Sequence, residues 1–138
     1  MIEIKPFRGV RYSASHVRDL SNVVAPPYDV ITQDLQESLY ETHHYNCVRL
    51  TFGKIYGSDT PDDNRYTRSS QSLNDWMAKG TLAADAEPSI YITQQEYPVP
   101  LWPHGPMTPT KRRQVGFVAL SKLRPLTSGD IFPHERTH

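Results

Sequence analysis

The apolar positions near the N-terminus alternate with polar ones at the spacing of a strand. Ile2 and Ile4 predict a short strand. Pro6 ends that strand or confines it to a sheet edge, because proline has no amide proton to donate. The polar run 13–22 predicts a short helix. Residues 23–31 follow, and two adjacent prolines hold their backbone extended.

The central part of the chain predicts two helices with a strand between them. Thr32 is a good N-cap for a helix whose apolar positions recur at helical spacing and fade near His43. Residues 46–52 are rich in apolar positions and predict a strand. A second helix is expected to start at Asp63 or Asn64, either of which can cap it.

The last third of the chain predicts a β-hairpin with an enlarged loop. Strand patterns cover 89–97 and 112–123, and five prolines break regular structure in the loop 98–110. The order β, α, β, α, β, β predicts an α+β fold, with a small mixed β-sheet and two or three helices. A length of 138 residues suits a single domain, 1–138.

Composition narrows the classes of function. Fifteen basic residues balance fifteen acidic ones, so charge gives no argument for a nucleic-acid or membrane partner. The chain has no long apolar run and no apolar signal region at its N-terminus, so we expect a cytoplasmic protein. The single Cys47 cannot form an internal disulfide. His43 and His44 would point about 100° apart on a helix, so we predict no metal site there.

A polar cluster near the C-terminus could carry chemistry. His134 and Glu135 can transfer protons near neutral pH, and Arg136 offers forked donors to a phosphate or carboxylate. The apolar residues 131–133 precede them and would anchor the cluster to a core. The alternative interpretation is a solvated chain terminus.

Two other segments present polar groups in defined local structure. The rigid segment around the paired prolines presents Tyr28 and Asp29, which could hold a base in fixed geometry. Alternatively it is a structural turn in which Asp29 bonds local amides. Arg65 and Arg68 lie three apart at a predicted helix start, where anions bind favourably. The usual explanation of such arginines is a solvated helix face, and we favour it here.

Six short motifs occur along the chain in a recognisable order. They lie at 4–9 (IKPFRG), 24–31 (VAPPYDVI), 46–50, 64–66, 116–120 and 133–137 (PHERT). Together they resemble a bacterial and archaeal family filed as domain of unknown function ten-fifteen, over essentially the whole chain. Members of that family are longer and usually carry leucine at the position of His138. The resemblance implies an N-terminal fragment that would dock to a missing C-terminal region or self-associate.

That family is in turn similar to the ParB and sulfiredoxin-like superfamily, which includes free-serine kinases. The resemblance implies a ParB-like fold and kinase-like phosphoryl transfer to a small hydroxylated metabolite such as serine, with ATP or ADP and Mg²⁺. The implied catalytic residues are Asp29, His134 and Glu135, with Asp29 or Glu135 as the base. The implied substrate- or phosphate-binding residues are Tyr28, Arg65, Arg136 and Thr137.

Two alternatives to an enzyme stay open at this point. The chain could be a non-catalytic sensor that binds a nucleotide or phosphorylated metabolite in the same pocket. It could instead be a protein-interaction module that uses the proline-rich loop 98–110. The enzyme and the sensor both require a small-molecule ligand and a shared site, so they predict that residues 25–31 and 132–137 lie side by side.

Overall fold

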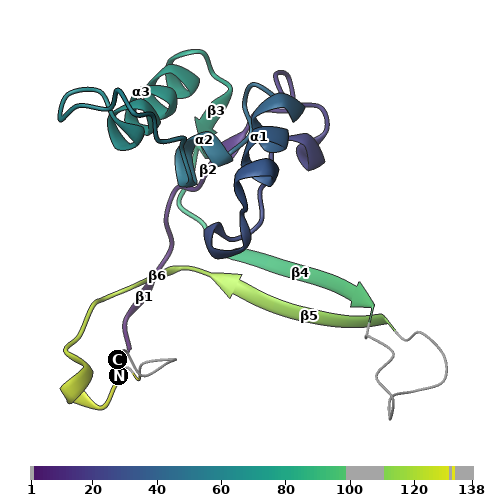
Figure 1. Cartoon of the computed structure of the whole chain (residues 1–138). Coiled ribbons are helices and arrows are strands. Elements are labelled where there is room, and N and C mark those ends of the chain that lie inside the picture. The colour runs from purple at the N-terminus through teal and green to yellow at the C-terminus, as the bar shows by residue number, and fades with distance from the viewer. Residues whose placement is uncertain (1, 99–110, 131, 133–138) are drawn as a thin grey trace, which may run out of the picture. The chain divides into compact units, whose positions relative to one another are not determined.

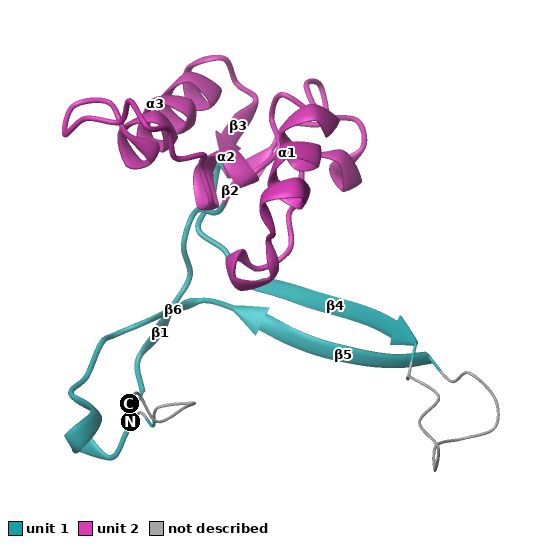
Figure 2. Ribbon diagram, viewed as in Figure 1, with its two compact units in different colours: residues 1–9, 86–138 teal, residues 10–85 magenta. Residues whose placement is uncertain are grey.

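The computed structural model describes residues 2–98, 111–130 and 132 (Figure 1). The chain forms two compact units, residues 10–85 and residues 1–9 with 86–138 (Figure 2), and each is described by itself. Three α-helices and three two-stranded sheets make up the regular structure of these residues, together with short 3-10 turns. The fold is therefore α+β, as predicted. The strand pairs are all antiparallel, in separate small sheets.

Helix α1 (Gln33–Thr42) begins and ends where the sequence predicts. The Thr32 hydroxyl accepts a hydrogen bond from the Leu35 amide at 3.3 Å, which satisfies one of the free amides of the first turn. The backbone returns to an extended conformation at His43.

Helix α3 (Arg65–Ala78) starts at a complete capping box. The Asn64 side chain accepts hydrogen bonds from the first-turn amides, and the Thr67 hydroxyl accepts one from the Asn64 amide at 2.8 Å. Past its end, Gly80 has a φ of 72°, a left-handed conformation that favours glycine. With 14 residues α3 is the longest described helix, and none of these helices is long and apolar enough to span a lipid bilayer.

The predicted strand at 46–52 is wrong, because this segment folds as the short helix α2 (Val48–Thr51). The cause is the fully buried Asn46. Its Nδ2 donates to the carbonyl oxygens of Asn22 and Val24, each at 3.0 Å, and its Oδ1 accepts from the first amide of α2 at 3.0 Å. Bonds to residues more than 20 positions away in the sequence therefore set the local conformation, which an apolar pattern cannot show.

The polar run 13–22 is helical only at its end. Leu20–Asn22 form a 3-10 turn, η1, and the Asp19 carboxylate accepts a hydrogen bond from the Ser21 amide of this turn. The predicted short helix is thus replaced by turns over most of its length.

The hydrophobic core of the described residues lies within unit 10–85. There β2 (Val10–Tyr12) pairs with β3 (Leu82–Ala84), and the indole of Trp76 contacts Tyr12 and Tyr45 with ring centroids 6.3 and 5.5 Å apart. Burying such side chains supplies most of the stabilisation of a small domain. The buried hydrophobic residues are Val17, Val23, Ile31, Val48, Trp76 and Leu82.

The other unit contains the predicted hairpin. Strand β4 (Tyr91–Pro98) pairs with β5 (Lys111–Val118) over all eight residues of each strand. The short strand β1 (Ile4–Lys5) pairs with β6 (Leu120–Ser121). The antiparallel register confirms the hairpin, whose proline-rich loop 99–110 lies outside the described residues.

A close backbone approach anchors the base of the hairpin. The Gly9 amide donates to the Tyr91 hydroxyl at 2.6 Å, and the rings of Phe7 and Tyr91 lie 5.0 Å apart. A Cβ atom at Gly9 would stand 2.6 Å from that hydroxyl oxygen, so any other residue there would force the Tyr91 ring to shift. Farther along, the paired side chains of Ile92 and Phe117 are exposed on one face of the hairpin.

We predict that Asn46→Asp lowers the free energy of unfolding by about 2–5 kcal/mol, because two buried carbonyls lose their donors and face a carboxylate. Asn64→Asp is the matched control. The Asn64 amide also donates to two carbonyls, but at exposed positions where water can replace it, and aspartate caps helices well. We expect a change below about 1 kcal/mol there. Urea unfolding of the full chain measures both, and equal losses would contradict the role assigned to Asn46.

A second prediction concerns alkaline pH. Burial, with a smaller effect of Cys47, raises the pKa of Tyr12 from 10.0 to about 12, and its hydroxyl donates to the Tyr45 carbonyl at 2.7 Å. A raised pKa stabilises the fold below pH 10, and that contribution is lost as the pH rises from 10 to 12. Tyr12→Phe should therefore be less stable than the wild type at pH 8, with a gap that narrows by pH 11. Urea unfolding at both values tests this, and a constant gap would contradict it.

Candidate functional site

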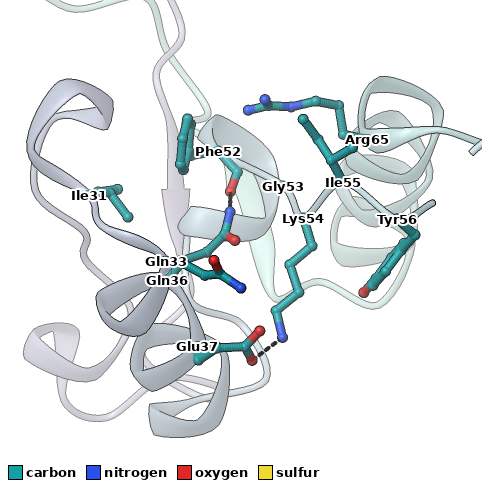
Figure 3. Close-up of a pocket in the computed structure, with 10 residues that line it drawn as sticks. All are labelled: Ile31, Gln33, Gln36, Glu37, Phe52, Gly53, Lys54, Ile55, Tyr56 and Arg65. Atoms are coloured by element: carbon teal, nitrogen blue, oxygen red, sulfur yellow. Dashed lines mark hydrogen bonds and ion pairs between the residues drawn. The ribbon is translucent and has the colours of Figure 1, made fainter.

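A groove in unit 10–85 is the main candidate site (Figure 3). It lies between α1, the start of α3 and the segment 52–56, which follows α2. Its volume is about 540 Å³, within the range of small-molecule sites. The groove is lined by Ile31, Gln33, Gln36, Glu37, Phe52, Gly53, Lys54, Ile55, Tyr56 and Arg65.

The turn at 52–54 is held in place by side chains from two helices. From α1, Gln36 Nε2 donates to the Phe52 carbonyl at 2.7 Å, and the Tyr40 hydroxyl accepts from the Lys54 amide at 3.0 Å. From α3, Arg68 Nη2 donates to the Lys54 carbonyl at 3.0 Å. The backbone of the groove wall is therefore fixed before any ligand binds.

A smaller hollow adjoins the groove and is lined by cations. Its volume is about 150 Å³, and it shares Gly53, Lys54, Tyr56 and Arg65 with the groove lining. Arg49 and Arg68 also line it, and no carboxylate lines it among the residues that the structure describes. We call this space the cationic hollow.

Two of these cations are neutralised by carboxylates. Lys54 Nζ forms an ion pair with Glu37 (dashed in Figure 3), and the hydrogen bond that it donates to Glu37 raises the pKa of Lys54. Arg68 Nη1 lies 2.8 Å from Asp63, and its Nη2 lies 2.8 Å from Asp59. Both side chains thus have partners that stabilise the fold.

The other two cations are held by aromatic rings. The Arg65 guanidinium carbon lies 4.8 Å from the centroid of Phe52 and 5.6 Å from that of Tyr66. The Arg49 guanidinium carbon lies 4.0 Å from the centroid of Tyr40, and its Nη2 donates to the Tyr40 carbonyl at 2.8 Å. Within the described ranges, neither arginine forms an ion pair with a carboxylate.

The structure brings two of the predicted site residues to the same aromatic ring. Tyr28 lies in a 3-10 turn, η2 (Tyr28–Val30), with 69% of its surface exposed and its ring centroid 6.4 Å from that of Phe52. Arg65 contacts the same ring. Asp29 lies in the same turn as Tyr28, is exposed, and does not line the groove.

The C-terminal candidates cannot be placed beside them. His134, Glu135, Arg136 and Thr137 lie outside the described residues. Their predicted position next to 25–31 stays a prediction.

The sequence patterns do not predict Phe52, Lys54 or Arg49 as site residues. Phe52 and Arg49 fall in the segment that was wrongly predicted as a strand. A strand in that segment gives no reason to place their side chains beside residues of α1 and α3. The three-residue spacing of Arg65 and Arg68 was the one available signal, and it does mark the side of α3 that faces the cationic hollow.

In the part of the chain that the structure describes, no group of three or more histidine, cysteine, aspartate or glutamate side chains could hold a metal ion. Glu37 is the carboxylate that lines the groove.

Comparison with known proteins gives one match. Neither a curated protein nor a solved structure matches the chain. A family model described as "Protein of unknown function (DUF1015)" matches residues 4–138, almost the whole chain. This match confirms the family resemblance that the six sequence motifs indicate. The chain belongs to the DUF1015 family of proteins of unknown function.

Proposed function

We propose that this chain is a nucleotide- or phosphate-metabolite-handling domain of the cytoplasm, and that its ligand binds in the groove. The observation that carries the proposal is that Arg65 lacks a carboxylate partner among the described residues. Its guanidinium stands over Phe52 at the groove and, among the described residues, has no carboxylate partner. Its forked donors are therefore available to a phosphate.

The rest of the groove suits the organic part of such a ligand. Phe52 and Ile55 supply apolar surface, and Gln33 supplies an amide that can donate and accept. Tyr28 lies within ring-contact distance of Phe52 and carries a hydroxyl. A ligand with a flat or apolar body and one anionic group would satisfy both kinds of surface.

The more specific form of the proposal is phosphoryl transfer to a small hydroxylated metabolite such as serine, as the similarity to ParB-like serine kinases implies. ATP or ADP with Mg²⁺ would supply the phosphoryl group and neutralise its charge. Nucleotide-bound Mg²⁺ usually needs only one or two protein carboxylates, and Glu37 is the one that lines the groove. The proposed proton-transfer residues remain Asp29, His134 and Glu135, and the proposed further phosphate ligands remain Arg136 and Thr137.

A non-catalytic sensor is the second candidate, and the groove lining favours it in one respect. A kinase needs a base within hydrogen-bond reach of the attacking hydroxyl. Among the described groove residues the only carboxylate is Glu37, and it is engaged with Lys54. A sensor needs the phosphate contact and no base.

We predict that phosphorylated ligands bind more tightly than their unphosphorylated counterparts, and that the difference depends on Arg65. ATP, ADP and O-phosphoserine are titrated calorimetrically against adenosine and serine. Arg65→Gln should weaken binding of the phosphorylated ligand about ten- to a hundredfold, the usual effect of losing a charge-assisted hydrogen bond. Arg18→Gln is the control, since Arg18 is an exposed arginine of the same unit that lines neither the groove nor the cationic hollow.

Equal affinities for Arg65→Gln and Arg18→Gln would refute the proposal, as would the absence of binding by all three phosphorylated compounds. Incubation with ATP and serine then separates the two forms. Formation of phosphoserine and ADP, lost in Asp29→Asn, indicates the enzyme. Binding without turnover indicates the sensor.

A further inference from the structure

The cationic hollow is too small to be a separate binding site for a metabolite. Its volume of about 150 Å³ is well below the roughly 300–1,000 Å³ of typical small-molecule sites. It opens beside the larger groove and shares the turn at 53–54 with it. The hollow therefore suits one compact group of a ligand whose body lies in the groove.

The charges around the hollow favour an anion. Its four cations are Arg49, Lys54, Arg65 and Arg68, and the carboxylates that pair with them are Glu37, Asp59 and Asp63. Four positive charges against three negative ones leave an excess of one. Lys54 and Arg68 with their three carboxylates carry a net charge of −1, so the excess of one comes from the two positive charges of Arg49 and Arg65.

Arg49 also has an unused donor at this position. Its Nε is buried and has no hydrogen-bond partner within the described part of the chain. The guanidinium cannot easily turn away, because it lies on the Tyr40 ring and one of its Nη atoms donates to the Tyr40 carbonyl. The Nε–H is closed off from solvent, so a ligand in the hollow would reach Arg49 through the Nη atoms of the guanidinium.

We propose that the cationic hollow is an oxyanion subsite that takes the phosphate of a phosphomonoester, with Arg49 and Arg65 as its donors. This inference rests on the proposed function, since it names the end of the groove at which the phosphate binds. Lys54 and Arg68 line the subsite but keep their carboxylate partners. Two guanidinium groups favour the phosphate dianion over the monoanion, because both can form charge-assisted hydrogen bonds to it.

The test uses inorganic phosphate and sulfate as probes on the full chain. Dissociation constants come from calorimetry, at constant ionic strength with chloride. Arg49→Lys and Arg65→Lys retain the charge and lose the forked donors, and each should weaken binding of both anions about tenfold. Arg18→Lys is the control and should bind like the wild type. General effects of salt on protein stability act equally on all variants, so they do not produce a difference between the variants.

The pH dependence gives a second readout that needs no variant. A phosphate group gains its second charge near neutral pH, whereas sulfate is already a dianion. Phosphate should therefore bind more tightly at pH 8 than at pH 5.5, while sulfate affinity should not rise. A parallel change in both anions would overturn the preference for the dianion. If Arg49→Lys fails to fold, anion binding by Arg65→Lys and the comparison of phosphate with sulfate at the two pH values still test the subsite.

The outcomes separate the subsite from the proposed function. Phosphate binding that depends on Arg49, without binding of any nucleotide or phosphoserine, would support the subsite and refute the proposed function. Nucleotide binding that depends on Arg65 and is unchanged in Arg49→Lys would overturn the subsite alone. No binding of phosphate or sulfate to the wild type would also overturn it.

Discussion

The groove depends on one constraint, which is the attachment of the turn at 52–54 to helices α1 and α3. A turn that follows a four-residue helix has little stability of its own. Here the Phe52 carbonyl accepts from Gln36, and the backbone of Lys54 is bonded to Tyr40 and Arg68. Because the two helices contribute side chains to the same turn, their separation and the position of the groove wall are set together. The Phe52 ring is thereby fixed as the surface on which Arg65 and Tyr28 meet.

Helix α2, which precedes this turn, is held at its N-terminal end by Asn46. The Asn46 side chain forms hydrogen bonds with two carbonyls and one amide. Helix α2 is too short to persist alone, so its position comes from these tertiary bonds. Arg49 lies between the two anchors. Its place on the Tyr40 ring is consequently a property of the core of the unit, although its guanidinium lines a solvent-accessible hollow. Such preorganisation is what an anion site requires, since little reorganisation remains to oppose binding.

The sequence predicts those parts of the fold whose signals are local. Thr32 and Asn64 cap helices with their own side chains, and the alternating pattern of the hairpin strands needs only their own residues. The conformation of 46–52 is decided by bonds from Asn46 to Asn22 and Val24, so its apolar residues are misleading. The residues of the candidate site also divide into those with local signals and those without. Tyr28 and Arg65 can be proposed from their own segments, but Phe52, which brings them together, belongs to the segment whose fold is set at a distance.

Membership of the DUF1015 family gives the chain relatives but no chemistry, and the partners of individual side chains are what indicate a function. Cations that look equivalent in the sequence differ in this respect. Arg65 and Arg68 lie one turn apart on α3, yet Arg68 is bonded to two carboxylates and a carbonyl, while Arg65 lies over aromatic rings and has no carboxylate partner in the described structure. An ion-paired arginine cannot contact a new anion without weakening its existing bonds, whereas one held by a ring keeps its donors free. The division of the four cations into those with carboxylate partners and those without is therefore the physical basis for the phosphate site that we propose.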